Sequence, residues 1–121
     1  MRGHHHNLHP DLRAKLTFLE AAMGFELDVT SGYRDPEHNI DVGGVPDSEH
    51  TCDPAMGADV LCLRSSTRYR MLKVLLMQGV KRIGIGRTFI HVGISPSHPQ
   101  EVLWHYYPDP KSPTKTPTTP V

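Results

Sequence analysis

A polar stretch of thirteen residues, "SEHTCDPAMGADV", spans residues 48–60 and combines several residue types that bind metals. It places His50 just before a turn and Asp59 at the start of an apolar run, and His91 lies far along the chain inside "TFIHVGI". Two imidazoles and one carboxylate form a reasonable zinc ligand set, and three protein ligands leave a fourth position for water. Such an open site suits hydrolysis, because zinc lowers the pKa of its bound water to about 7. The residue types therefore indicate a catalytic rather than a structural metal site.

Each of these residues also has an ordinary alternative role. A lone histidine in a strand is usually a hydrogen-bonded core residue, and an aspartate such as Asp59 can simply cap a turn. No two of the candidates have the i, i+4 helical spacing of an H-E-x-x-H zinc motif. Spacing alone therefore leaves both the metal site and a plain structural role open.

The elements that must position these residues follow from hydrophobic periodicity. Leu12, Leu16, Leu19 and Met23 predict one apolar face of a helix that begins near residue 10 and ends at Gly24. Alternation predicts a half-buried strand over 25–29. Residues 32–47 are rich in Gly, Pro, Asp and Asn, which predicts a loop whose length makes it a candidate for a functional role.

Later in the chain, "ADVLCL" at 58–63 predicts a strand, and residues 65–79 predict a second helix capped by Ser65 or Ser66. Its apolar face is expected to hold Met71, Leu72, Leu75 and Leu76. Residues 80–94 predict two short strands around a turn, with His91 on a central strand. The expected fold class is α+β, with two helices packed on a small, mainly antiparallel sheet.

Composition limits the class of protein. The length of 121 residues predicts one small domain. The formal net charge is zero, so the composition shows no excess of basic residues that would indicate nucleic-acid binding. No apolar run reaches the roughly 20 residues of a membrane-spanning helix, and no secretory signal is evident. We expect residues 1–107 to form the domain and residues 108–121, rich in Pro, Thr and Lys, to form a disordered tail.

Two further features belong to this picture. Cys52 and Cys62 could form a bridge, but two free thiols are the preferred interpretation. The start of the chain, "MRGHHH", could bind metal adventitiously and is left out of the expected fold.

Several motifs occur together in a recognisable order: "SGYRDPEHN", "VGGVPDSEH", "GADV", "RIGIGRTFIHVG" and "VLWHYY". They resemble the zinc D-Ala-D-Ala carboxypeptidase family. That family also holds the VanX dipeptidases, phage L-alanyl-D-glutamate endolysins and, as a fold relative, the hedgehog signalling domain. The resemblance covers about residues 7–107, and the motifs are specific only in combination.

The resemblance implies a role for each matching residue. His50, Asp59 and His91 would be the zinc ligands. Arg34 would face the substrate carbonyl or carboxylate, because a guanidinium offers a rigid fork of donors and stays charged. Ser48 would help to hold the substrate. Trp104 would pack against a zinc ligand, with a role as a plain core anchor as its equal alternative.

This chain departs from the family pattern in two places. The family aspartate usually follows the first histidine by seven residues, where Gly57 stands here, and Asp59 follows His50 by nine. Asp59 is preferred because it leads into the strand, as the family aspartate does, and Asp53 is the alternative if the loop folds back.

The second departure concerns the general base. Active members usually carry an acidic residue or a histidine a few positions before the last ligand, but Thr88 stands three residues before His91. The general base could then be Glu49, Asp53, Glu101 or His105, and sequence alone does not place any of them.

Two functions remain. The first is a zinc peptidase that cuts a D-amino-acid-containing bond of the peptidoglycan stem peptide, as a carboxypeptidase or an endopeptidase. The second, favoured by Thr88, is a catalytically weak, zinc-containing module that binds the cell wall. Either is expected to be a monomer without nucleic-acid partners or membrane insertion. We expect the protein to be cytoplasmic in its host or associated with a phage, and to act at the cell wall.

Overall fold

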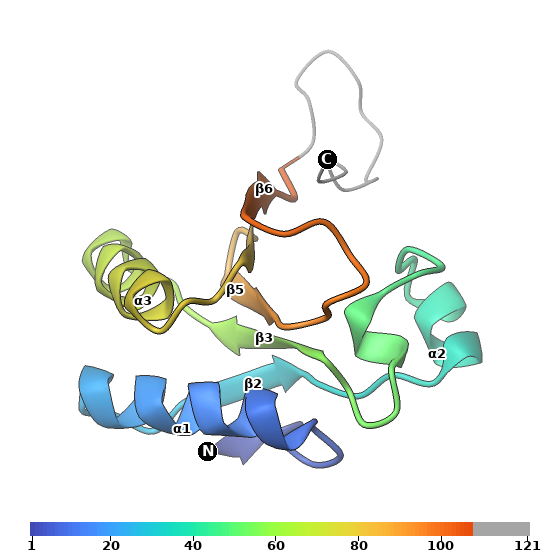
Figure 1. Ribbon diagram of the computed structural model, residues 1–121, viewed down its shortest axis with the longest axis horizontal. Coiled ribbons are helices and arrows are strands. Elements are labelled where there is room, and N and C mark those ends of the chain that lie inside the picture. The colour runs from blue at the N-terminus through green and yellow to red at the C-terminus, as the bar shows by residue number, and fades with distance from the viewer. Residues whose placement is uncertain (108–121) are drawn as a thin grey trace.

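The computed structural model describes residues 1–107, which form an α+β fold (Figure 1). Its helices are α1 (Pro10–Met23), α2 (Pro36–Asp41), the short 3₁₀ helix η1 (Glu49–Thr51) and α3 (Ser65–Met77). Its strands are β1 (Arg2–Gly3), β2 (Asp28–Ser31), β3 (Gly57–Leu61), β4 (Arg82–Ile85), β5 (Phe89–Gly93) and β6 (Val102–His105). None of these helices is both long and apolar enough to cross a membrane. The tail predicted for residues 108–121 lies outside the described residues.

All six strands form one sheet in the order β1-β2-β3-β5-β4-β6. The three inner pairings are antiparallel, whereas β1–β2 and β4–β6 at the two edges are parallel. The sheet is therefore mixed, and the expectation of a mainly antiparallel sheet is corrected at its edges. The parallel edge pair β1–β2 arises because α1 serves as the crossover between the two strands. The start of the chain thus contributes a strand that the sequence interpretation had left out.

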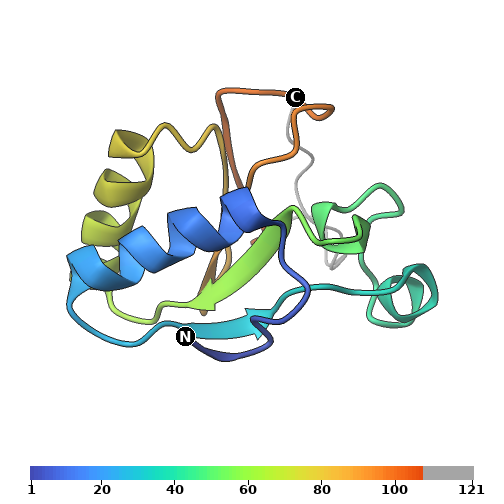
Figure 2. The ribbon, with the colours of Figure 1, turned by 60° about the horizontal axis from the view of Figure 1, so that its bottom comes forward.

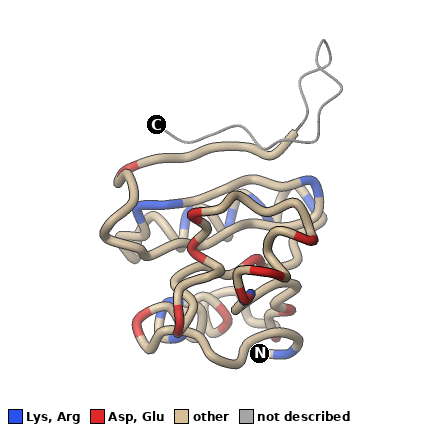
Figure 3. Tube along the Cα trace, turned by 90° about the vertical axis from the view of Figure 1, so that its right-hand side faces the viewer, with Lys and Arg blue, Asp and Glu red and all other residues tan. Residues whose placement is uncertain are grey.

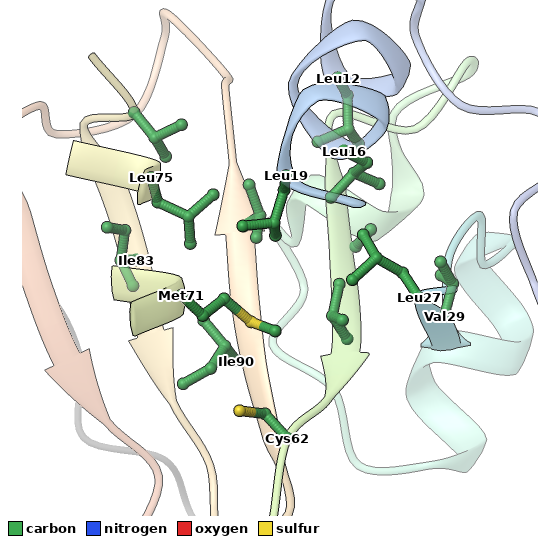
Figure 4. Packing of buried hydrophobic residues seen from close by; sticks show 14 of the residues in the cluster. Leu12, Leu16, Leu19, Leu27, Val29, Cys62, Met71, Leu75, Ile83 and Ile90 are labelled. Carbon is green, nitrogen blue, oxygen red and sulfur yellow. The ribbon is translucent and has the colours of Figure 1, made fainter. Parts of the chain in front are cut away.

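The sheet has two different faces. Helices α1 and α3 lie together against one face, whereas α2 and η1 lie at the other end of the molecule (Figures 1 and 2). Leu12, Leu16 and Leu19 of α1 and Met71 and Leu75 of α3 meet the strand side chains there (Figure 4). The opposite face carries the polar side chains of the inner strands, because successive residues of a strand point to opposite sides.

Local chemistry explains the helix ends. Pro10 stands in the first turn of α1, and Gly24 ends the helix with a φ of 78° that favours glycine. The Asp35 carboxylate caps α2 through the His38 N–H, with Pro36 next in the chain. This cap forms a short helix where the sequence predicted only a loop over 32–47.

Other boundaries differ from expectation by a few residues. The strand predicted over 25–29 is found as Asp28–Ser31, and Phe25 is exposed. The N-cap of α3 is Arg64, without a side-chain hydrogen bond, rather than Ser65 or Ser66. Its predicted apolar face is only partly buried, because Leu76 is 64% exposed. Both cysteines are free thiols, as expected.

The part of the chain that contains α2 and η1 is acidic. Arg34 is the only lysine or arginine between residues 32 and 63, and acidic positions predominate on this side of the molecule (Figure 3). The side chains of His50, Asp59 and His91 are nearly all buried and lie beneath this side rather than on it.

Candidate metal centre

Three predicted residues meet on the sheet face opposite α1 and α3. Asp59 of β3 and His91 of β5 are direct neighbours in the antiparallel register, and His50 of η1 reaches over them. The Asp59 Oδ1 atom lies 3.2 Å from His50 Nε2 and 2.8 Å from His91 Nδ1. One potential ligand atom from each residue lies within 4.8 Å of the others, and all three residues are buried. These residues form the only such group found within residues 1–107.

The loop between His50 and Asp59 absorbs the two extra residues. Ala55 is completely buried and pairs with the N-terminal segment, since its N–H donates to Asn7 and its carbonyl accepts the His9 N–H. Asp53 instead accepts a hydrogen bond from Asn7 and is not part of the cluster. The structure therefore brings the preferred aspartate, Asp59, to His50 and leaves the alternative, Asp53, aside.

Each histidine has a hydrogen-bond acceptor at its outer ring nitrogen, which is the nitrogen that faces away from Asp59. His50 Nδ1 lies 2.7 Å from the Gly32 carbonyl oxygen, which can only accept a hydrogen bond. His91 Nε2 lies 2.9 Å from Glu49 Oε1. When each outer nitrogen carries its proton, His50 Nε2 and His91 Nδ1 present their lone pairs to the space beside Asp59. Metal-ligating histidines usually have such an acceptor behind them.

The spacing suits a tetrahedral ion. Ligand atoms about 2.0–2.1 Å from a tetrahedral zinc lie about 3.3 Å from one another. The two distances from Asp59, 3.2 Å and 2.8 Å, are close to this value. The residues present therefore fit a small divalent metal ion.

Without a metal, the contacts in the cluster favour a protonated His91 and an ionised Asp59. Burial opposes the charged form of His91, but its hydrogen bonds to Asp59 and Glu49 raise its pKa to about 9. Burial likewise opposes ionisation of Asp59, yet hydrogen bonds from His50 and His91 hold its pKa well below the usual range. In the absence of metal, a proton on His91 Nδ1 thus occupies the direction in which a metal would bind.

Arg34 lies beside the cluster. Its backbone N–H donates to the His50 carbonyl, and its guanidinium donates to Asn39 Oδ1 and Ser31 Oγ. Ser31 is paired with Asp59 across β2 and β3. Both side-chain partners are neutral, and no acidic side chain of the described region forms an ion pair with Arg34. Its charge is therefore held in place without being neutralised.

Ser48 and Trp104 have clear structural contacts. Ser48 is buried, and its Oγ accepts the His50 N–H as the cap of η1. The centres of the Trp104 and His91 rings lie 5.6 Å apart. The Arg82 guanidinium lies 5.1 Å from the centre of the Trp104 ring. The roles of Ser48 in substrate binding and of Trp104 in packing a ligand stay predictions, although the contact between Trp104 and His91 is consistent with the second.

The structure places the candidate general bases outside the cluster of His50, Asp59 and His91 or behind His91. Thr88 is exposed in the turn between β4 and β5. His105 pairs with Ile85, whose side chain belongs to the helix-covered face, so it points away from His91. Glu101 is exposed next to β6, and Glu49 is buried behind His91, on the ring nitrogen that faces away from Asp59.

Sequence reasoning missed three contributors to the site. Arg82 is buried beside Glu49, and the Ser95 N–H donates to the Glu49 carboxylate. The alternation of Arg82 and Gly84 with Ile83 and Ile85 was the available signal, because it places Arg82 on the face of His91. Tyr106 also packs edge-to-face on Trp104, with ring centres 6.1 Å apart. Burial and the nearby Asp59 charge raise the pKa of Tyr106, so it keeps its proton.

Comparison with known proteins identifies the family. A family model described as Peptidase M15 matches residues 2–93. The chain belongs to the peptidase M15 family. The matched region includes all three residues of the cluster, and it ends before β6 and Trp104. Neither the curated proteins nor the solved structures gave a significant match, so the hedgehog-like arrangement stays a prediction.

Membership in the M15 family confirms the resemblance seen in the sequence motifs. It establishes the class of protein, a peptidase, and the buried cluster is compatible with a metal-dependent member.

Proposed function

We propose that the protein is a zinc-dependent peptidase that hydrolyses a D-amino-acid-containing peptide bond of peptidoglycan, as a D-Ala-D-Ala carboxypeptidase or a phage-type endopeptidase. The observation that carries this proposal is the convergence of His50, Asp59 and His91 at one buried point. Family membership supports the peptidase chemistry. A phage-associated monomer that acts at the cell wall is the setting we propose for it.

Zinc is the metal that this donor set favours. Two imidazole nitrogens and one carboxylate oxygen form a typical three-ligand catalytic site, whereas Mg²⁺ and Ca²⁺ prefer oxygen ligands alone. When bound, zinc supplies Lewis acidity that activates water and polarises a carbonyl at neutral pH. The carboxylate of Asp59 contributes one negative charge, so the site as a whole stays cationic toward an anionic substrate.

Arg34 is proposed to bind and orient the substrate. Its guanidinium is fixed by two neutral hydrogen bonds and has no acidic partner among the described residues, so its charge is free for a carbonyl oxygen or a carboxylate. A charged donor that is fixed beforehand stabilises negative charge that develops during attack on a carbonyl. Arg34 would therefore lower the barrier as well as hold the peptide.

A second candidate function is a zinc-containing module that binds the cell wall and has little catalytic activity. The placement of Thr88, Glu101 and His105 favours it, because none offers an acid or base toward the cluster. Glu49 is also unsuited to this task, since its carboxylate is already bound to His91 and the Ser95 N–H. An efficient general base would then have to be a group other than Thr88, Glu101, His105 and Glu49.

The test is digestion of purified peptidoglycan by tag-free protein, with and without added zinc, followed by mass spectrometry of the released fragments. Zinc-dependent release of D-Ala or of a stem-peptide fragment is the expected result, and it would identify the bond. Binding of about one zinc per chain together with no release would replace the peptidase with the binding module.

A pair of arginine variants sharpens this test. Arg34→Ala is expected to retain zinc and to lose most turnover, because it removes a charged donor at the site. Arg70→Ala is the matched control, since Arg70 is exposed on α3, whose helix covers the opposite face of the sheet. Equal turnover in the two variants would reduce Arg34 to a surface charge.

A further inference from the structure

Glu49 is a buried carboxylate that the proposed peptidase mechanism does not use. The residue is only 3% exposed, and it is the first residue of η1, next to the proposed ligand His50. Its Oε1 atom lies 2.9 Å from His91 Nε2, and its Oε2 atom accepts the Ser95 N–H at 2.9 Å. Both carboxylate oxygens are therefore engaged, and one of them is bound directly to a proposed metal ligand.

Arg82 is a second cationic side chain beside the Glu49 carboxylate. Its Nε atom lies 3.1 Å from Glu49 Oε1, which is an ion pair without the alignment of a hydrogen bond. Arg82 is itself held by a hydrogen bond to the Pro99 carbonyl and by the Trp104 ring beneath it. Burial would raise the pKa of Glu49, but the hydrogen bond and charge of His91, the Ser95 N–H and the Arg82 charge together lower it.

The backbone leaves a space that this carboxylate fills. A Cβ atom on Gly93 would come close to both Glu49 oxygens, and one on Gly57 would meet the Glu49 Cβ at 2.7 Å and the His91 ring at 2.7 Å. Glycine at these two positions therefore allows Glu49 to lie against the edge of the His91 ring. Two strands and η1 cooperate in this arrangement.

We propose that Glu49 is the positioning residue of the metal centre, which accepts the His91 Nε2–H and thereby fixes His91 Nδ1 as the metal-binding atom. The proposal rests on the metal-binding part of the proposed function and goes beyond it by assigning Glu49, Arg82 and the Ser95 N–H. A carboxylate behind a ligating histidine fixes its tautomer and ring orientation and makes it a better donor. Glu49 therefore acts through His91 and does not touch the substrate.

An ordinary structural role would give a different result. Glu49 could serve only to tie η1 to β4 and the segment after β5 through its ion pair and hydrogen bond. The two roles differ in their effect on the metal, because only the positioning role predicts a change in zinc affinity that is separate from a change in stability.

The test compares Glu49→Gln with a matched control, Glu20→Gln. Glu20 also accepts a backbone N–H, from Leu27, and also pairs with a cation, the Met1 ammonium, but it contacts no proposed ligand. Zinc affinity is measured by competition with a chelator, and the free energy of unfolding is measured in parallel on the zinc-free proteins. We expect Glu49→Gln to bind zinc about ten- to hundredfold more weakly and Glu20→Gln to match the wild type.

A spectroscopic measurement makes the assignment specific. In the zinc-loaded wild type, ¹⁵N NMR is expected to show His91 protonated at Nε2, with the resonance of a strong hydrogen bond. That resonance should shift in Glu49→Gln and stay unchanged in Glu20→Gln. Because a glutamine keeps the shape of the side chain, this variant avoids the buried empty space that Glu49→Ala would leave.

The outcomes separate the two proposals. A wild type that binds zinc, with unchanged affinity and an unchanged His91 resonance in Glu49→Gln, would overturn the role of Glu49 and leave the proposed function intact. A wild type that binds no zinc would overturn both. Loss of zinc affinity in Glu49→Gln without loss of peptidase activity at saturating zinc would support the positioning role.

Discussion

Metal uptake near neutral pH should release a proton from His91. In the metal-free protein the His91 imidazolium donates to Asp59 on one side and to Glu49 on the other, and these carboxylates raise its pKa to about 9. A metal must displace the proton on Nδ1, since that atom faces Asp59. Asp59 contributes no proton of its own, because its pKa is well below the usual range and it is ionised throughout.

The magnitude follows from the distance between pH and pKa. At pH 7, a group with a pKa of about 9 is neutral in about one molecule in a hundred, so apparent metal affinity is reduced about hundredfold relative to high pH. Affinity should rise about tenfold per pH unit between pH 7.5 and 8.5, where an ordinary imidazole is already neutral.

The same shift predicts how the metal-free protein responds to alkaline pH. The pKa of His91 is raised above its unfolded value of 6.5, so its contribution to stability is complete below pH 6.5 and is lost as pH rises through about 9. The rise corresponds to about 3 kcal/mol, since one pKa unit is about 1.4 kcal/mol. Denaturant unfolding at pH 6.5 and pH 10 should differ by an amount of this order.

The direct assay is an NMR titration of histidine ring nitrogens in the metal-free protein, with His91→Gln used to assign the resonance. Isothermal calorimetry in buffers of different ionisation enthalpy then counts the protons released by zinc. A His91 resonance that titrates below pH 7 would refute the reasoning, because the two carboxylates would then fail to stabilise the imidazolium.

Three further predictions follow from the same geometry. Asp59→Asn should weaken zinc binding strongly, because it removes the only carboxylate of the cluster. Asp53→Asn should bind zinc normally, because Asp53 lies outside the cluster. Chelator competition would show the opposite order of zinc affinities if Asp53 were the ligand. Gly93→Ala should also lower zinc affinity, because its Cβ would displace the Glu49 carboxylate, and unchanged binding would mean that this carboxylate can move freely. Leu16→Ala should cost about 3 kcal/mol of unfolding free energy at a completely buried position, while Phe18→Ala, 58% exposed, should cost far less; equal costs in denaturant unfolding would contradict the assigned face of α1.

The sequence by itself determined the family and the main local elements. The apolar spacing of Leu12, Leu16, Leu19 and Met23 defines α1, because a helix turns every 3.6 residues and buries one face. The ordered motifs around Arg34, His50 and His91 identified the M15 family, and the match over residues 2–93 confirms it. These features are local, so neighbouring residues carry enough information to reveal them.

The sequence did not determine the sheet edges. The strands β1 and β6 each contain four residues or fewer, and each exists because a distant strand offers unpaired backbone groups. Such short segments have no pattern of their own that would indicate pairing. The same limitation explains why α2 was taken for loop, since a six-residue helix depends on its cap rather than on an apolar face.

Only the tertiary structure decided what surrounds the metal-binding residues. The register of β3 and β5 sets Asp59 against His91, and the loop that packs Ala55 on the N-terminal segment brings His50 back to them despite the longer spacing. The tertiary structure also places Glu49 against His91 Nε2, where it is a hydrogen-bond partner of the proposed ligand and not a general base. Residue types can indicate which side chains bind a metal, but hydrogen-bond direction depends on positions in space that distant segments set together.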